Sequence, residues 1–203
     1  MHFEQDYIFH LYNQGNNKQP IFYTDENYIY FLKKIKKHIL PYADVLAWCL
    51  MPNHFHLMIY VRKTEIIVPD SELMTPSHRL IIRPRTLNNS IAIMLRSYTR
   101  AINKQENFSG SLFRKKTKAE CINCPNGLTP SFIMESGITK IPNIQPEKQY
   151  HQICFNYIHQ NPVKSGLVKK DIDWEYSSAK DYAGLRDGKL INKQLAKKFL
   201  LKY

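Results

Sequence analysis

The spacing of apolar residues divides the first part of the chain into a strand and a helix. Tyr7–Tyr12 alternates apolar and polar positions, as a half-buried strand does. After the polar stretch Asn13–Pro20, Thr24 can cap a helix that carries apolar residues at helical spacing up to Ile39. Pro41 cannot continue that helix, so the pattern predicts that it ends there.

The following segments predict a hairpin, a loop and a second helix. Val45–Leu50 and Phe55–Val61 are apolar-rich strand candidates, joined by the tight connection Met51-Pro52-Asn53. Residues Lys63–Thr86 contain prolines and no sustained period, which indicates a long loop. Leu87–Gln105 returns to helical spacing and therefore predicts the second helix.

A turn at Ser109-Gly110 leads into a short predicted strand, Leu112–Cys121. The order strand, helix, strand, strand, helix, strand is typical of the ferredoxin-like α+β arrangement (βαββαβ), an antiparallel sheet with two helices on one face. A further helix is predicted from about Glu147 to Gln160, ending at Asn161-Pro162, and a C-terminal helical extension covers 171–203. We therefore expect one domain over 1–203, with insertions at 63–86 and 123–146.

Composition indicates the kind of partner. The chain of 203 residues has 29 Lys and Arg against 17 Asp and Glu, a net charge of +12, which favours binding to a polyanion such as nucleic acid. No apolar run is long enough for a membrane span and no secretory signal is visible, so we expect a cytoplasmic protein without a membrane partner. The four cysteines are irregularly spaced and are expected to be reduced. Cys121 and Cys124 have zinc-site spacing, but plain surface cysteines are the preferred interpretation because no second pair follows.

His54-Phe55-His56 is the sharpest chemical feature. Side chains at positions i and i+2 of a strand point to the same face, so both imidazoles are expected to project together and could hold a divalent cation. The alternative is a pair of ordinary strand histidines, each hydrogen-bonded locally. The triplet alone does not decide between the two.

Longer motifs carry a resemblance to a known family. Met51-Pro-Asn-His-Phe-His-Leu-Met58 resembles the signature of the single-tyrosine HUH transposases, and the chain is most similar to the REP-associated tyrosine transposases. Five more segments match that branch in order, and together the matches extend from about Tyr7 to Tyr182. They are residues 13–22 (NQGNNKQPIF), 97–99 (SYT) with 110–114 (GSLFR), 157–166 (YIHQNPVKSG) and 174–178 (WEYSS).

The resemblance implies a reaction and its residues. His54 and His56 would hold Mg²⁺ or Mn²⁺ at one phosphodiester of single-stranded or hairpin DNA, and Tyr98 would attack the phosphorus. The products would be a free 3′-hydroxyl and a 5′-phosphotyrosine, and the reverse step would rejoin strands. Tyr98 also lies in the apolar stripe of its helix, where tyrosines are usually core residues, and Tyr157 is the competing candidate. Related transposases act as monomers or homodimers.

One position departs from the family pattern. Relatives can place a Gln or Asn ligand four residues after the tyrosine, but Ile102 stands there and cannot coordinate a metal. Asn103, one residue further, is the expected third ligand. Asn161-Pro162 is predicted to hold a helix end rather than take part in catalysis. Because of Ile102, a folded but inactive transposase remnant that only binds DNA or RNA remains an alternative function.

Basic residues supply candidate DNA contacts. They fall into two groups, one on the second helix and one on the predicted strand Leu112–Cys121, and each could equally be solvated surface charge: Arg96 and Arg100; Arg114, Lys115, Lys116 and Lys118.

Overall fold

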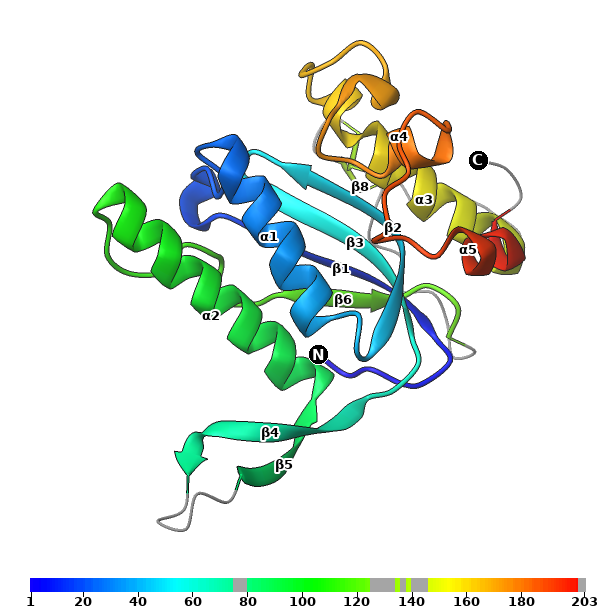
Figure 1. The fold of residues 1–203 in the computed structure, drawn as a ribbon. Coiled ribbons are helices and arrows are strands. Elements are labelled where there is room, and N and C mark those ends of the chain that lie inside the picture. The colour runs from blue at the N-terminus through cyan, green and yellow to red at the C-terminus, as the bar shows by residue number, and fades with distance from the viewer. Residues whose placement is uncertain (75–79, 125–133, 136–137, 140–145, 201–203) are drawn as a thin grey trace.

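The computed structural model describes residues 1–74, 80–124, 134–135, 138–139 and 146–200, and the side chains of these residues except within 69–82, 134–135, 138–139 and 146–149. Its centre is a four-stranded antiparallel sheet in the order β2-β3-β1-β6 (Figure 1). The strands are β1 (Ile8–Gln14), β2 (Ala43–Met51), β3 (His54–Val61) and β6 (Lys118–Cys121). The α+β class and the antiparallel sheet predicted from the sequence are confirmed.

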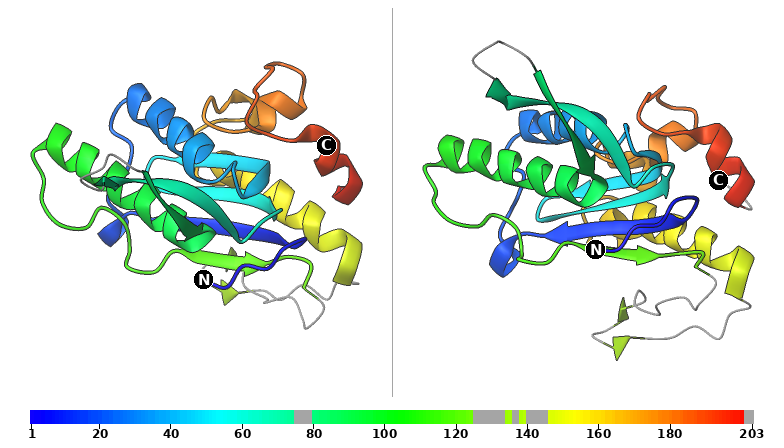
Figure 2. Two further views of the ribbon diagram at one scale, coloured as in Figure 1. Left: turned by 60° about the horizontal axis from the view of Figure 1, so that its bottom comes forward. Right: turned by 90° about the horizontal axis from the view of Figure 1, so that it is seen from below.

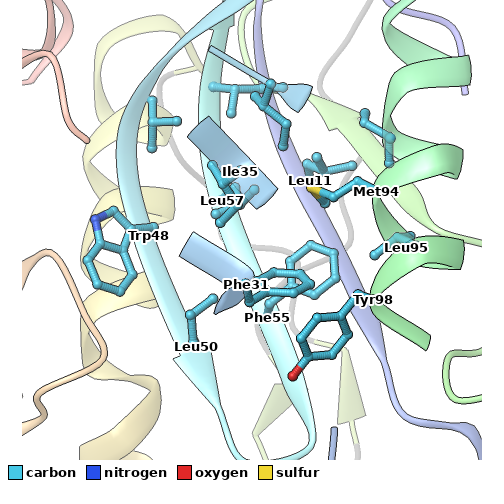
Figure 3. Packing of buried hydrophobic residues seen from close by; sticks show 14 of the residues in the cluster. Leu11, Phe31, Ile35, Trp48, Leu50, Phe55, Leu57, Met94, Leu95 and Tyr98 are labelled. Atoms are coloured by element: carbon cyan, nitrogen blue, oxygen red, sulfur yellow. The ribbon is translucent and has the colours of Figure 1, made fainter. Parts of the chain in front are cut away.

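Helices α1 (Asp25–His38) and α2 (Leu87–Glu106) cover one face of this sheet (Figure 1). The main hydrophobic core lies between them and the strands. Side chains of α1 and α2 such as Phe31 and Leu95 pack there against Leu11, Phe55 and Leu57 (Figure 3). On β1 and β3, odd-numbered residues face this core because side chains alternate between the two faces of a strand.

A third helix, α3 (Pro146–Lys164), lies on the opposite face of the sheet (Figure 2). It packs through Cys154, Phe155 and Ile158 against the even-numbered side chains of β1 and β3, such as Ile8 and Met58. A one-residue bulge in β2 after Val45 adds further apolar side chains to this second core. The sheet is therefore buried on both faces, and α3 covers the face that carries His54 and His56.

The C-terminal segment ties α3 to the outer strand β2. It contains η2 (Asp171–Asp173), α4 (Ala179–Tyr182) and α5 (Lys193–Phe199). The indole nitrogen of Trp174 donates to the carbonyl oxygen of Leu50 at 3.0 Å, and the backbone nitrogen of Trp48 donates to Ser178 Oγ at 2.9 Å. These bonds use the free edge of β2 and fix the helix that covers the histidine face.

The long loop predicted at 63–86 is wrong. The segment forms an antiparallel hairpin of β4 (Glu65–Met74) and β5 (Leu80–Thr86) that projects from the sheet (Figure 1), and 75–79 lie outside the described residues. Pro69 and Pro84 made a strand look improbable. A two-stranded ribbon tolerates them because both of its edges are open, so a residue without an N–H need not break a ladder bond.

Two other boundaries differ from the sequence prediction. The last strand was expected over Leu112–Cys121, but β6 begins only at Lys118, and the preceding residues are irregular. α3 continues through Pro162 to Lys164 instead of ending at Asn161. Proline lacks the N–H that would bond to the carbonyl oxygen of Ile158, so one helical hydrogen bond is absent near this end. The Asn161 side chain donates to a different acceptor, the carbonyl oxygen of Tyr157, at 2.7 Å.

The predicted insertion at 123–146 lies mostly outside the described residues. Its described parts include the paired strands β7 (Met134–Glu135) and β8 (Ile138–Thr139). Near the other end of the chain, the polar stretch after β1 contains the short helix η1 (Asn16–Lys18), so the break predicted there is present.

Buried histidines should make the fold sensitive to acid. His159 on α3 is 4% exposed, its Nε2 lies 2.7 Å from Ser178 Oγ, and desolvation lowers its pKa to about 3. Because this value is below the unfolded value of about 6.5, the unfolded chain binds the proton first as the pH falls. The stability that the neutral form of His159 contributes is complete above about pH 6.5 and is lost progressively toward pH 3.

We expect His159→Gln, which can keep a bond to Ser178 without titrating, to lose less stability on acidification. The free energy of unfolding should fall less steeply than in the parent, by about 1.4 kcal/mol per pH unit between pH 6 and pH 5. Urea unfolding at pH 7, 6 and 5 measures both slopes. Parallel slopes in the two proteins would contradict the prediction.

Candidate active site

His54 and His56 open β3 and project from the same face of the sheet, as the sequence predicted. Their ring centroids are 5.0 Å apart and the ring planes are nearly perpendicular, at 84°. His54 is partly exposed and His56 is 5% exposed. Phe55 points to the opposite face, into the core beneath α1 and α2 (Figure 3).

Each of these imidazoles has a partner at Nδ1. His54 Nδ1 lies 2.5 Å from Asn53 Oδ1, and His56 Nδ1 lies 2.9 Å from His10 Nε2. The amide oxygen of Asn53 can only accept, so His54 carries its proton on Nδ1 and presents the lone pair of Nε2. His56 Nε2 is buried and has no hydrogen-bond partner among the described residues.

Burial also keeps both rings neutral. Desolvation lowers the pKa of His54 to about 4, although the Asn161 side chain, as an acceptor for protonated His54, opposes the shift. The pKa of His56 lies well below its ordinary value, mainly because of desolvation and further because of the neighbouring histidines. A neutral imidazole is the form that binds a metal ion, so the site needs no deprotonation near neutral pH.

Helix α3 brings Tyr157 and Asn161 to the histidine face. The two residues are four positions apart and therefore share one side of the helix. The Tyr157 ring meets His56 edge to face, with centroids 5.4 Å apart. The Asn161 side chain is close enough to His54 and to the Tyr157 hydroxyl to influence the pKa of both groups. Two histidines, a tyrosine and a carboxamide thus converge between β3 and α3.

Two further groups shape the surroundings of the Tyr157 phenol. Desolvation by burial raises its pKa, and the hydrogen bond from Asn161 partly offsets this effect. The ammonium of Lys164 lies 5.8 Å from the ring centroid. The phenol is therefore protonated at rest, and a cation lies near its ring.

Tyr98 does not lie beside the histidines. It is fully buried in the core between α1, α2 and the sheet, packed edge to face against Phe31 (Figure 3). Its hydroxyl donates to the carbonyl oxygen of Ile21 at 2.7 Å, and burial raises its pKa. The helical stripe does face the sheet, as the sequence indicated, but it faces the side of Phe55 and not the side of His54 and His56.

Asn103 is equally remote from the histidines. Its amide nitrogen donates to the carbonyl oxygen of Gly110 at 2.9 Å, which joins the C-terminal end of α2 to the loop that follows. The expected metal-ligand position of Asn103 is therefore wrong. Asn161 stands four residues after Tyr157, the spacing that was sought after Tyr98. That signal was present in the sequence but was assigned to a helix end.

A donor set for a divalent cation is present at the site. Within the described ranges, no three His, Cys, Asp or Glu side chains form a metal-binding group. Two neutral imidazoles and the carboxamide of Asn161 nevertheless combine nitrogen and oxygen ligands that suit Mn²⁺ or Mg²⁺ with water. The unpartnered, buried Nε2 of His56 is the observation that favours this fit.

The two groups of basic residues meet in one groove. Arg96 and Arg100 on α2 face Arg114 and Lys115 across a groove of about 560 Å³, which we call the basic groove. Among the described residues, none of those that line it is acidic. Lys118 is on β6 and reaches the histidine face, where its ammonium lies 5.8 Å from the centroid of the Tyr12 ring. Lys116, the remaining basic residue of the second group, is exposed.

No protein-family model matches the chain, and no curated protein matches its sequence. Among solved structures, that of a REP-associated tyrosine transposase bound to a REP hairpin superposes on it with a TM-score of 0.52. The match covers 95% of this chain and 94% of the other at 14% sequence identity. The two proteins share a fold. The resemblance inferred from the sequence motifs is thus confirmed at the level of the fold.

The cysteines differ from the expectation of four reduced thiols. Cys121 and Cys124 form a disulfide at the end of β6, with Cα atoms 5.8 Å apart, and Cys49 and Cys154 are free and buried. Cys121 and Cys124 are therefore neither plain surface thiols nor a zinc pair in this structure.

The described residues contain no candidate for a membrane-spanning helix. None of their helices has the combination of length and apolar character that a bilayer crossing requires.

Proposed function

We propose that the chain is a tyrosine transposase of the HUH type, a metal-dependent endonuclease and strand transferase for single-stranded DNA with Tyr157 as its nucleophile. One observation carries the proposal. Tyr157 and Asn161 of α3 lie directly over His54 and His56 of β3, on one face of the sheet. The fold shared with a REP-associated tyrosine transposase supports it, and we interpret the four-stranded core as the ferredoxin-like arrangement of that class.

A divalent cation, Mg²⁺ or Mn²⁺, would be held by His54, His56 and Asn161, and it would supply Lewis-acid polarisation of the scissile phosphate. Side chains of the protein carry out the remaining steps of the reaction. The Tyr157 oxygen forms a bond to phosphorus while the bond to the 3′-oxygen breaks, and the proton lost by the phenol balances the proton gained by the 3′-hydroxyl. Lys164 favours the developing phenolate by its charge. The phosphotyrosine conserves the bond for rejoining, so no nucleotide cofactor is needed.

Hairpin or single-stranded DNA is the proposed substrate. The transposase of similar fold is bound to a REP hairpin, and the basic groove here has the charge to hold a phosphate backbone. The groove also lies near the site. The backbone nitrogen of Arg114 donates to the carbonyl oxygen of Gln14 at 2.8 Å, and Gln14 pairs with His54 in the sheet. A strand leaving the groove could therefore pass Lys118 at the sheet edge and reach Tyr157.

The inactive-remnant alternative loses its main support. It rested on Ile102, which stands four residues after Tyr98 and cannot bind a metal. With Tyr157 as nucleophile the corresponding residue is Asn161, which has a suitable oxygen and lies beside His54. We therefore propose an active enzyme.

Substitution of the histidines tests the metal site. His54→Gln and His56→Gln should each abolish cleavage of a labelled DNA hairpin with a single-stranded flank, because each removes one ligand while retaining a polar side chain. EDTA should stop the parent, and added Mn²⁺ should restore it. The control is His159→Gln, a buried histidine of α3 that hydrogen-bonds with Ser178 and should cut normally near neutral pH. Full cleavage by both site variants would refute the proposal.

A further inference from the structure

His10 lies next to the proposed metal site but belongs to another strand. It is on β1 opposite Met58, two pairs along from the pairing of Tyr12 with His56. Its side chain is 1% exposed, and its ring lies at 26° to the His56 ring, with centroids 5.0 Å apart. Burial lowers the pKa of His10 to about 3, so this histidine is neutral in the folded protein.

The hydrogen bond between His10 and His56 permits only two proton arrangements. His56 Nδ1 and His10 Nε2 are 2.9 Å apart, and one proton lies between them. If His56 carries that proton, it donates to His10 and its own Nε2 presents a lone pair. If His10 carries it, His56 holds its proton on Nε2 and has no lone pair there for a cation. Only the first arrangement allows His56 to bind a cation.

His54 shows the same arrangement with a different partner. Its Nδ1 is held by Asn53 Oδ1 at 2.5 Å, which also leaves Nε2 as the ligand atom. Metal-binding histidines generally donate their second ring N–H to such a partner, which fixes the tautomer and the ring orientation. His10 therefore stands in relation to His56 as Asn53 does to His54.

Neighbouring residues hold the His10 ring in place. The Tyr12 ring stacks on it with centroids 4.8 Å apart, and the Tyr12 hydroxyl donates to Glu120 Oε1 at 2.6 Å. The Tyr157 ring meets it edge to face at 5.9 Å. The position of the His10 acceptor atom is thus fixed from three strands and from α3.

We propose that His10 is a positioning residue that fixes the tautomer and orientation of His56, so that His56 Nε2 faces the cation. The inference rests on the proposed metal-dependent function. It assigns to His10 no contact with the cation or with DNA. A side chain that accepts a hydrogen bond at the same place should therefore replace it.

The test compares His10→Gln with His10→Leu. The amide of Gln can reach the place of Nε2 and accept from His56, whereas Leu fills the buried space without an acceptor. Mn²⁺ affinity is measured without DNA from the electron paramagnetic resonance signal of the free ion. We expect His10→Leu to bind Mn²⁺ roughly 10- to 100-fold more weakly than the parent and His10→Gln to stay within about threefold. The ¹⁵N shifts of the His56 ring in the metal-free proteins should show Nδ1–H in the parent and a changed tautomer in His10→Leu.

Each result bears on one of the two proposals. Unchanged Mn²⁺ affinity in His10→Leu, or equal loss in both variants with both still folded, would overturn the positioning role while leaving the metal site intact. A parent that binds no Mn²⁺ would instead overturn the metal site. If His10→Leu does not fold, the His56 tautomer in the parent decides, because a proton on Nε2 contradicts the inference. Asn53→Asp, which keeps an acceptor for His54, is the matched control and should leave the His56 tautomer unchanged.

Discussion

Replacing Tyr157 by Phe should abolish the covalent protein–DNA adduct, whereas replacing Tyr98 by Phe should leave it intact. Tyr157 lies against His56 on the face covered by α3, and removal of its oxygen removes the nucleophile. Tyr98 lies in the opposite core, where its hydroxyl bonds only to a backbone carbonyl among the described contacts. Loss of that bond should destabilise the fold by about 1 kcal/mol and should not affect the chemistry.

The measurement uses a labelled DNA hairpin with a single-stranded flank, incubated with Mn²⁺ and each protein. Adducts that survive a denaturing gel are counted for the parent and the two variants, and urea unfolding reports their stabilities. DNA binding should survive in both variants because each keeps its ring. An adduct that persists in Tyr157→Phe and disappears in Tyr98→Phe would show that the assignment from the structure is wrong.

Neutralising the basic groove should weaken DNA binding on the order of 100-fold at low salt. The variant replaces four residues by Gln: Arg96, Arg100, Arg114 and Lys115. These side chains line one groove without an acidic neighbour in the described structure, so they can contact successive phosphates. If each contacts one phosphate of a single strand, the slope of log affinity against log salt should decrease by about three.

The control removes the same number of charges elsewhere. Lys33, Lys34, Lys36 and Lys37 lie on α1, away from the residues that line the groove, and their replacement by Gln gives the same net charge. Binding is measured over a range of salt concentrations in the Tyr157→Phe background with EDTA, so that cleavage does not interfere. Equal losses in the two variants would show that overall charge, and not the groove, attracts the DNA.

Much of the fold follows from patterns that are local in the sequence. The alternation in β1, the helical stripes of α1 and α2, and the hairpin of β2 and β3 all specify their elements directly. The hairpin β4–β5 was missed because its prolines conflict with a general strand preference that an open ribbon does not enforce. The continuation of α3 past Pro162 was missed because proline usually ends a helix, whereas this helix continues to Lys164 with one backbone bond fewer.

The candidate site also has one part that the sequence predicts and one part that it does not. The two histidines and their common direction were predictable, because the two-residue period of a strand fixes which side chains share a face. Which tyrosine lies beside the histidines was not predictable. A helical stripe indicates that a helix packs on a sheet, but it does not indicate on which face. Both Tyr98 and Tyr157 lie on helices that pack against the sheet. Only the tertiary structure places Tyr157 on the histidine side.

The sequence by itself thus determined the α+β class, the paired histidines and the excess of positive charge, since these depend on periodicity and composition. The tertiary structure decided which tyrosine meets the histidines, that His10 from another strand supports His56, and that two separate basic segments line one groove. Each of these depends on the strand order β2-β3-β1-β6 and on the face that α3 covers. Contacts of that kind join residues far apart in the chain, so no local pattern encodes them.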